Sequence, residues 1–435
     1  MGRPRLAAIA GIVAVVAAVA TAILLLVGGG ASPAPAAAAP AETTGGYATA
    51  PGATTVAGTG IPGYGGDGAA AVGAQLDDPS GMVENASGDL FIADTGNCRV
   101  REVTAEAGVA FGHRVQAGQI LTVAGGPCSA AADPAPSAVA VDAAGDLFIA
   151  SGPSNRVDEL PATTGTSFGR SVVAGKLVSL AGSGVAGSVG DGAPAVHSEL
   201  DDPSGVTVDP SGDLFIADTA NCRLRMVAAS SGSRFGMTVV QGDIYTVAGT
   251  GICGSQGDGG PALGAELWDP GALAVDAGGD VLVADQGNRT IRVLTSHSGT
   301  FYGVALVADD LGTVAGEGSY GPYLVDGLSA VGETAELNFP TAIAVDAHGN
   351  LYIADGAIHA IRLVPASTTT LLGKAATADN MYTVAGAMST DVLHSRTEWI
   401  QTRMLDPAGL ALTPGGQLVY SDGQADVVRR LPAGI

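Results

Sequence analysis

The sequence repeats one short pattern six times at regular spacing. Each copy holds a glycine, a polar residue, a short apolar run and, in five of the six copies, a closing aspartate. The six glycines are Gly88, Gly145, Gly212, Gly279, Gly349 and Gly416. In the first five copies a segment similar to Thr-Val-Ala-Gly begins 34 residues after the glycine, as from Gly88 to Thr122. Such a constant interval indicates one supersecondary unit repeated along the chain.

Each unit is predicted to contain four short strands. In the third copy, residues 206–208 and 214–217 are short and apolar, and residues 209–212 between them read Asp-Pro-Ser-Gly, which is typical of a turn. Residues 223–227 alternate polar and apolar side chains, and residues 243–247 form the last apolar run. Four short antiparallel strands joined by turns are typical of a β-propeller blade. The fold class predicted is therefore all-β.

The two ends of the repeat region predict how the ring closes. The sixth copy, residues 407–431, contains three strands, and the sequence ends at Ile435 before a fourth. An extra strand of the fourth type, residues 54–58, precedes the first copy. We expect it to complete the last blade, because that pairing removes two exposed strand edges. Residues 51–435 are thus predicted to form one six-bladed propeller of four-stranded antiparallel blades.

The N-terminal region predicts export. Residues 1–5 carry two arginines, and residues 6–27 are uncharged, which as a helix would span about 33 Å. The arginines favour a cytoplasmic N-terminus, a transmembrane signal anchor and a propeller outside the cytoplasm. A signal peptide cleaved near residues 36–41, giving a secreted protein, is the alternative. Residues 28–50 are rich in Ala, Pro and Gly and are predicted to be a linker.

The charge of the chain excludes some partners. With 19 basic and 42 acidic residues the formal net charge is −23. This balance argues against nucleic acid and against anionic lipid surfaces, since both need basic patches. We therefore expect membrane contact only through the N-terminal helix. The preference for Ala, Gly and Arg, with only two lysines (Lys176 and Lys374), suggests a bacterial source.

The repeat resembles the NHL family of six-bladed β-propellers. The resemblance rests on the pattern Pro-x-Gly-apolar-x-x-Asp-x-x-Gly-Asp-Leu-Phe-Ile-Ala-Asp-Thr-x-Asn-x-Arg at residues 203–223, and nearly so at residues 79–99. The Gly-rich version with TVAGTG and GDG segments is similar to propellers of bacterial exported proteins and to the NHL region of teneurins. Ser151 in copy two and residues 356–359 in copy five depart from the pattern.

The four cysteines form two matched pairs. Cys98 and Cys222 occupy one repeat position, and Cys128 and Cys253 both follow a TVAG-like segment. Equivalent placement in two blades predicts the disulfides Cys98–Cys128 and Cys222–Cys253, in agreement with export. No Cys-x-x-Cys motif is present, and no histidine lies beside either pair in the sequence to suggest zinc or a nucleophilic thiol.

Acidic residues recur at fixed positions of the repeat. Those that end the second strand and those that begin the turn before it are interpreted as turn and backbone-capping groups. The Gly-Asp-Gly-like loops at residues 66–68, 190–192, 257–259 and 326–327 are interpreted as structural. A third set precedes the first strand and comprises Asp78, Asp202, Asp269 and Asp406, with Phe339 in copy five. Each aspartate precedes proline, so a turn is one reading, and a partial carboxylate ring that could bind Ca²⁺ is the other.

Two further residues are candidate binding residues. Glu84 is polar in the first strand, where copies two to five have valine, and it is either a tolerated variant or part of a channel site. Trp268 takes a position that is Asp77, Asp201, Asn338 or Leu405 in other copies. It is either a packing residue or a binding anchor at one rim.

The sequence predicts a binding module rather than an enzyme. No set of catalytic residues converges in the repeat pattern: the histidines at 113, 197, 297, 348, 359 and 394 fall at different repeat positions, and no Gly-x-Ser-x-Gly motif occurs. The expected partner is an extracellular protein, peptide or glycan, with no cofactor other than possible Ca²⁺. A metal-dependent propeller enzyme similar to lactonases or lyases, with a channel site near Glu84 and Asp78, is the alternative. The oligomeric state stays open.

Overall fold

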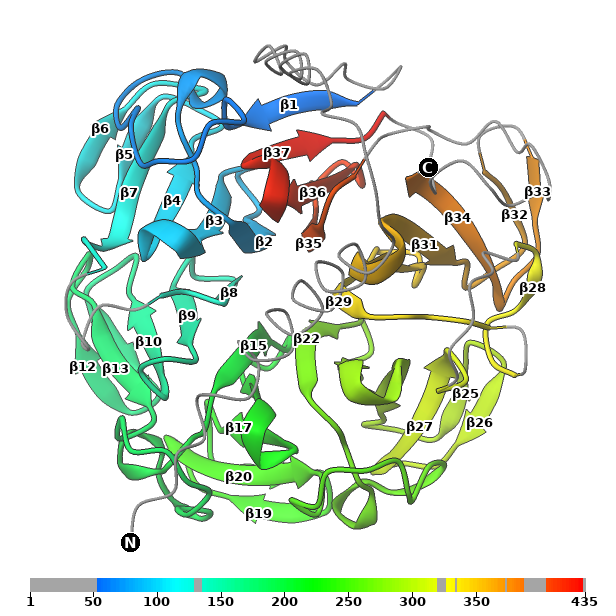
Figure 1. The fold of residues 1–435 in the computed structure, drawn as a ribbon. Helices are drawn as coiled ribbons and strands as arrows, with labels where there is room; N and C mark the ends of the chain where they lie inside the picture. The colour runs from blue at the N-terminus through cyan, green and yellow to red at the C-terminus, as the bar shows by residue number, and fades with distance from the viewer. Residues whose placement is uncertain are drawn as a thin grey trace, which may run out of the picture. The chain divides into compact units, whose positions relative to one another are not determined.

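A computed structural model describes residues 53–128, 135–318, 326–332, 335–371, 374–386 and 404–432. The chain divides into two compact units, Met1–Tyr47 and Ala48–Ile435, and the described residues all belong to the second. These residues form six antiparallel sheets arranged as the blades of a ring (Figure 1). The predicted all-β six-bladed propeller is confirmed. The predicted helix at residues 6–27 lies outside the described residues.

The first three strands of each blade follow the sequence pattern closely. The first strands are β2 Pro79–Glu84, β8 Ala138–Val141, β15 Pro203–Val208, β22 Pro270–Val275, β29 Pro340–Val345 and β35 Pro407–Leu412. The second strands are β3 Leu90–Asp94, β9 Leu147–Ser151, β16 Leu214–Asp218, β23 Val281–Asp285, β30 Leu351–Asp355 and β36 Leu418–Asp422. The third strands are β4 Arg99–Val103, β10 Arg156–Leu160, β17 Arg223–Val227, β24 Thr290–Leu294, β31 Ala360–Val364 and β37 Val427–Arg430.

The fourth strand closes each blade on its outer side. Blades 1 to 5 use the strand that contains the TVAG-like segment: β7 Ile120–Gly125, β13 Val178–Ala181, β20 Asp243–Ala248, β27 Asp310–Ala315 and β34 Asn380–Gly386. Blade 6 uses β1 Thr54–Ala57, which pairs antiparallel with β37 from Thr54 opposite Arg430. The predicted closure of the ring by the N-terminal strand is confirmed, and Figure 1 shows β1 beside β37.

The blades contain more strands than the four that we expected. Blades 3, 4 and 5 add a two-residue fifth strand on the outer edge, namely β14 Ala193–Pro194, β21 Gly260–Pro261 and β28 Leu328–Ser329. The segment between strands three and four, predicted as a connection, is a β-hairpin in blades 1 to 5. The hairpins are β5 Gly108–Ala110 with β6 His113–Val115, β11 Gly165–Ser167 with β12 Arg170–Val172, β18 Gly232–Arg234 with β19 Met237–Val239, β25 Gly299–Phe301 with β26 Val304–Leu306, and β32 Thr369–Leu371 with β33 Lys374–Ala376.

The repeated aromatic-Gly pair forms the turn of this hairpin. In blade 3, Phe235 and Gly236 have φ values of 45° and 68°, so both central residues of the turn are left-handed, as a two-residue hairpin turn requires. Phe235 also meets Phe215 edge-on, with the ring centroids 5.9 Å apart. Both rings belong to a hydrophobic cluster that includes Leu273 of blade 4. This aromatic therefore packs between neighbouring sheets.

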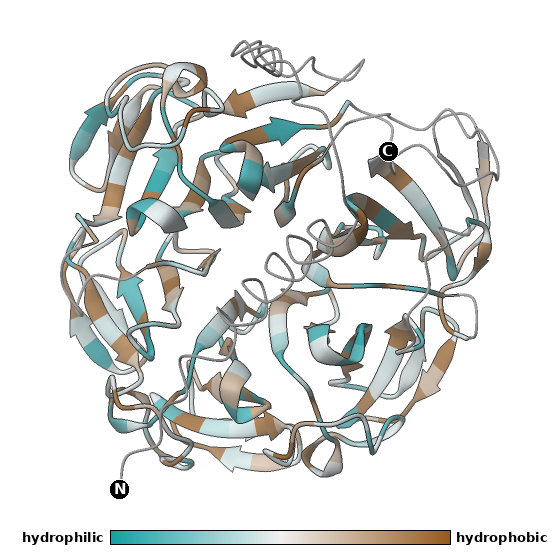
Figure 2. Cartoon of the chain, viewed as in Figure 1, coloured by the Kyte–Doolittle hydropathy of each residue, from teal (hydrophilic) through white to brown (hydrophobic). Residues whose placement is uncertain are grey.

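Apolar clusters between adjacent blades hold the ring together. The described residues form six such clusters, one at each junction, and brown apolar residues lie along the strands in Figure 2. The turn between strands one and two follows the expected chemistry, since Asp209 Oδ1 accepts the backbone N–H groups of Ser211 and Asp213 at 2.8 Å each. The repeated aspartates at this turn are therefore structural.

Both predicted disulfides are present. Cys98 is bonded to Cys128, and Cys222 to Cys253, with Cα atoms 5.3 Å apart in each pair. Each bond ties the start of a third strand to the segment that leaves the fourth. In the described part of the chain, we find no helix with the length and apolar character needed to cross a bilayer.

Candidate functional site

The first strands of the six blades surround a central channel. A cavity of about 640 Å³ opens from one of its faces, and its wall includes residues from all six first strands. One apolar residue from each blade occupies the same repeat position on this wall. The six residues are Met82, Val139, Val206, Leu273, Ile343 and Leu410. The middle of the channel is therefore apolar.

Hydroxyl groups near the beginning of the first strands connect one blade to the next. Ser80 donates to the backbone oxygen of Ser137 at 3.0 Å, and Ser137 in turn donates to that of Pro203 at 3.1 Å. Thr341 makes the same bond to Pro407, and Ser421 closes the series by donating to Ser80 at 2.8 Å. Because these hydroxyls already have backbone acceptors, they are structural links between blades.

Five residues immediately before the first strands form what we call the mouth ring. They are Asp78, Asp202, Asp269, Phe339 and Asp406. The four aspartates were predicted from the sequence, and the structure places them at the same end of the channel. Three of them have a left-handed backbone, with φ values of 50° at Asp78, 54° at Asp202 and 51° at Asp269. This is the turn conformation that aspartate tolerates.

The carboxylates of the mouth ring influence one another. Partial burial raises the pKa of Asp202, and the carboxylates of Asp201 and Asp269 raise it further. Burial and the Asp78 carboxylate raise the pKa of Asp406, while His359 opposes that shift. His359 and Asp406 both line the cavity. The mouth therefore favours cations, because a positive group would relieve this repulsion.

The same end of the channel exposes two aromatic side chains. Trp268 is 49% exposed and lines a separate pocket of about 660 Å³, where its indole lies against Gly287. Phe339 is 45% exposed and lines the cavity. Trp268 is a candidate from the sequence, where Phe339 stands out only as a departure from aspartate. The signal for Phe339 was available, since an aromatic at an otherwise acidic turn position is unusual.

The structure does not bring Glu84 to the mouth ring. Asp78 precedes β2 and Glu84 ends it, so about 20 Å of extended chain separates the two residues. The Glu84 side chain is 4% exposed, and its Oε2 lies 3.8 Å from Arg430 Nη2 across the junction of blades 6 and 1. Burial raises the pKa of Glu84, and Arg430 opposes the shift. These contacts support a structural role for Glu84 at the junction where the ring closes.

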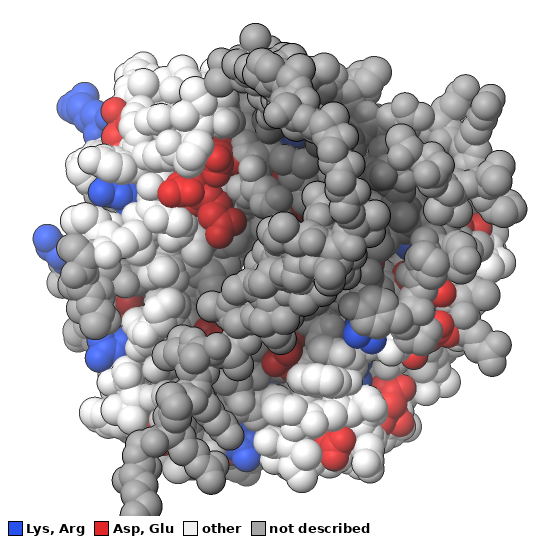
Figure 3. Space-filling view, in the orientation of Figure 1, with Lys and Arg blue, Asp and Glu red and all other residues white. Residues whose placement is uncertain are grey.

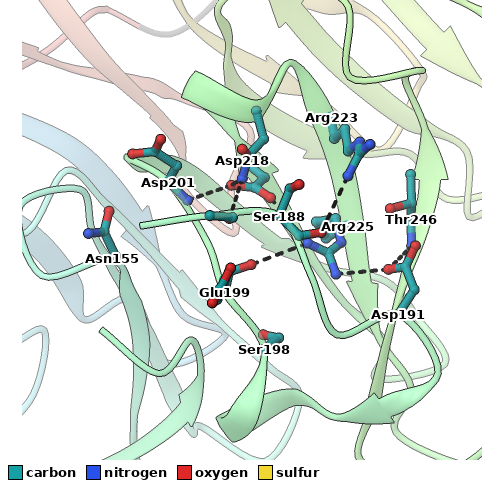
Figure 4. Close-up of polar contacts among 12 residues, drawn as sticks. Asn155, Ser188, Asp191, Ser198, Glu199, Asp201, Asp218, Arg223, Arg225 and Thr246 are labelled. Carbon is teal, nitrogen blue, oxygen red and sulfur yellow. Dashed lines mark hydrogen bonds and ion pairs between the residues drawn. The ribbon is translucent and has the colours of Figure 1, made fainter. Parts of the chain in front are cut away.

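Buried arginines, which the sequence reasoning missed, explain the Gly-Asp-Gly loops. In blade 3, Arg225 is fully buried and meets Asp218 Oδ2 at 3.2 Å through Nη1 (Figure 4). Its Nη2 meets Asp191 Oδ1 at 2.8 Å, and the same oxygen accepts the N–H of Thr246 at 2.9 Å. The corresponding pairs are Arg101 with Asp67, Arg292 with Asp258 and Arg362 with Asp326. The repeated arginine at one position of the third strand was the available signal.

The distribution of charge agrees with the sequence balance. Acidic side chains form several groups on the visible face, and basic side chains lie mostly toward its periphery (Figure 3). In the described part of the chain, no three His, Cys, Asp or Glu side chains are grouped so as to hold a metal ion.

Comparisons with known proteins agree with the repeat pattern. The family model of the teneurin NHL domain matches residues 165–295. Human teneurin-1 is 34% identical over 112 residues, which cover 23% of this chain and 4% of that protein. The matched segment is therefore a small part of the curated relative.

Two solved structures of bacterial proteins have similar folds. A protein of unknown function from Bacteroides thetaiotaomicron aligns with a TM-score of 0.55 at 14% identity, covering 88% of this chain and 75% of that one. An auxiliary nutrient binding protein from the same species aligns with a TM-score of 0.53 at 12% identity, covering 87% and 75%. At these identities the likeness shows the fold alone.

Proposed function

We propose that this chain, an NHL-repeat β-propeller, is an extracytoplasmic binding module whose channel mouth takes up a basic, partly apolar segment of an extracellular protein or peptide. The observation that carries the proposal is the pairing of the exposed Phe339 ring with the Asp406 carboxylate on the wall of the 640 Å³ cavity, with exposed Trp268 next to Asp269 at the same end of the blades. Exposed aromatic side chains at a cavity edge are typical anchors for a partner.

The chemistry of the mouth supports a cationic ligand. The raised pKa values of Asp202 and Asp406 reflect partly buried carboxylates that repel one another. A lysine or arginine side chain would reduce this repulsion and could also stack on the indole of Trp268. The apolar wall below the mouth would take aliphatic side chains of the same segment.

The two disulfides indicate an extracellular location, because such bonds persist in oxidising compartments. We propose in addition that residues 6–27 tether the propeller to the membrane. The protein should then be recovered in the membrane fraction of untreated cells. Protease treatment of intact cells should degrade its propeller. Recovery of the protein only from the medium would instead support a cleaved signal peptide.

The binding proposal can be tested with defined probes. We would titrate the protein with an Arg- and Leu-rich decapeptide, its Glu-for-Arg counterpart and a neutral oligosaccharide, and measure the affinity by calorimetry. Trp268→Ala and Phe339→Ala should each lower the affinity for the basic peptide about tenfold, which corresponds to the loss of one aromatic contact. Val307→Ala is the matched control, since Val307 is 59% exposed on the hairpin side of blade 4.

Three outcomes would change the proposed function. Equal affinity for the basic and acidic peptides would remove the role of the carboxylates. Unchanged binding by both aromatic variants would show that the wrong surface was chosen. Preference for the oligosaccharide over both peptides would assign the same mouth to a glycan.

A metal-dependent lactonase- or lyase-like function is the second candidate. The observation that favours it is the presence of His359 and Asp406 together on the cavity wall. Thermal unfolding in Ca²⁺, in Zn²⁺ and in chelator tests it, since a metal at 100 times its Kd stabilises the folded state by about 2.7 kcal/mol. A shift that disappears in Asp406→Asn would support the metal site, and an unchanged melting temperature would exclude it.

A further inference from the structure

The outer edge of blade 2 differs from that of its neighbours. In blades 3, 4 and 5 a segment of the preceding junction covers the fourth strand as β14, β21 or β28, and in blade 1 Ala70 bridges Gln119 in the same place. Among the described residues, no segment pairs with the outer side of β13. The sequence explains this difference: Gly88 and Gly145 lie 57 residues apart, whereas Gly145 and Gly212 lie 67 apart, so the junction into blade 2 is shorter by ten.

Blade 3 shows how such a covering segment binds. Gly192 donates its N–H to the backbone oxygen of Ile244 at 2.8 Å, and Ala193 lies opposite Ile244 in the ladder. One residue earlier, Asp191 Oδ1 accepts the N–H of Thr246 at 2.9 Å and the Nη2 of Arg225 at 2.8 Å. The aspartate therefore bridges an edge N–H group and a cation on the third strand.

Blade 2 presents the same backbone groups with the opposite charge beside them. Leu177, which is 39% exposed, and Ser179 occupy the positions of Ile244 and Thr246. Within the described chain, the Leu177 N–H and C=O and the Ser179 N–H have no hydrogen-bond partner on this edge. Asp158 replaces the arginine, and its Oδ1 accepts the hydroxyl of Ser179 at 2.7 Å. A covering segment would therefore meet one donor and one carboxylate.

We propose that the outer edge of β13 docks an extended strand of a partner protein that carries asparagine between two glycines. The asparagine would lie where Asp191 lies in blade 3, with its carbonyl oxygen accepting the Ser179 N–H and its NH₂ group donating to Asp158. The partner backbone would pair with the N–H and C=O of Leu177. An aspartate in that place would bring a second carboxylate against Asp158, and the two like charges would repel.

The edge already carries features that limit unspecific pairing. β13 has four residues, Lys176 precedes it, and Arg170 Nη1 donates to the Ser179 oxygen at 2.7 Å. Short edge strands with basic side chains discourage edge-to-edge aggregation. The bond from Arg170 leaves untouched the three backbone groups that a covering segment uses in blade 3. The edge therefore disfavours pairing with most strands and favours a strand that donates a hydrogen bond to Asp158.

The test uses two matched peptides. One has the sequence of residues 187–196, the covering segment of blade 3, and the other differs only by Asp191→Asn. We expect an NMR titration to show that the protein binds the asparagine peptide at least about tenfold more tightly than the aspartate peptide. A difference of this size is typical for the loss of one polar contact. The variant Ser151→Asp/Asp158→Arg gives blade 2 the charges of blade 3 and should reverse the preference.

A second variant covers the case in which the charge reversal prevents folding. Leu177→Pro removes an N–H group that the blade does not use, so the melting temperature should stay unchanged while binding of both peptides is lost. Equal binding of the two peptides to the unmodified protein, no binding at about millimolar concentration, or normal binding to Leu177→Pro would each overturn the proposal. Dimerisation that Leu177→Pro abolishes would assign the edge to a second copy of this chain and overturn it as well.

Discussion

Blades 2 and 3 share one backbone layout but differ in their polar interior. In blade 3, Arg225 is fully buried between Asp218 on the second strand and Asp191 on the covering segment. Blade 2 has Ser151 and Asp158 at the two corresponding strand positions and a shorter junction without the Gly-Asp-Gly loop. All three members of the charged set are therefore absent together.

The outer cover and the buried charge therefore depend on each other. A fully buried guanidinium is tolerated only when carboxylates and backbone oxygens satisfy it. The junction into blade 2 lacks the Gly-Asp-Gly loop that supplies Asp191 in blade 3, so an arginine at position 158 would lack that partner. In blade 2, Ser151 replaces the aspartate that ends the second strand. This replacement therefore accompanies the loss of the buried arginine and of the Gly-Asp-Gly loop.

The largest effect is expected from breaking the charged set of blade 3. Arg225→Ala leaves Asp218 buried without its cation and should lower the free energy of unfolding by about 3–5 kcal/mol. The matched change in blade 2, Asp158→Ala, should cost about 1 kcal/mol or less. Urea unfolding of both variants measures the difference. Equal losses would show that the buried arginine is not what distinguishes the two blades.

The two disulfides should contribute nearly equally although their junctions differ in length. The bridges enclose 30 and 31 residues of sequence separation. The double change Cys222→Ala/Cys253→Ala should therefore cost about 3–4 kcal/mol, and so should Cys98→Ala/Cys128→Ala. Thermal unfolding under oxidising conditions compares them. A much larger loss for the bridge on the short junction would show that it also holds blade 2 in place.

Glu102 should make stability depend on pH, whereas Met226 at the same position of blade 3 should not. Burial and the Asp89 carboxylate raise the pKa of Glu102 from 4.5 to about 7. The folded state then binds a proton that the unfolded state has released, so stability falls as the pH rises from 4.5 to 7. The loss is on the order of 3 kcal/mol and is complete above pH 7.

The variant Glu102→Met tests this dependence. In urea unfolding between pH 5 and pH 8, the variant should lack the decline in the free energy of unfolding that Glu102 causes, because the titrating group is gone. A decline of the same size in the variant would assign the pH dependence to other carboxyl groups.

The smallest effect is expected at the junction where the ring closes. Glu84→Val/Arg430→Leu gives this junction the apolar residues found at the same positions in blade 5, and the free energy of unfolding should change by about 1 kcal/mol or less. The single change Glu84→Val leaves Arg430, which is 35% exposed, without its partner and should be the less stable of the two variants. If the double variant lost several kcal/mol, the ion pair would be essential to closure.

Much of the fold was predictable because it is periodic. The constant spacing of the blade glycines, the turn chemistry at Asp209 and the extra strand at residues 54–57 are local features, and each predicts an element or a pairing without knowledge of distant contacts. The disulfides Cys98–Cys128 and Cys222–Cys253 followed from equivalent placement in two blades. The hairpins and fifth strands were missed because two- and three-residue strands carry too little periodicity to be recognised.

The site was less predictable. The sequence by itself determined the six-bladed ring, its closure and the cysteine pairing, because these depend on repetition at fixed intervals. Only the tertiary structure decided that Glu84 faces Arg430 across the closing junction, that Phe339 lines the channel cavity whereas Trp268 lines a separate pocket, and that Asp191 reaches Arg225. These contacts connect residues on different strands or blades, and their distances depend on how the sheets pack around the channel.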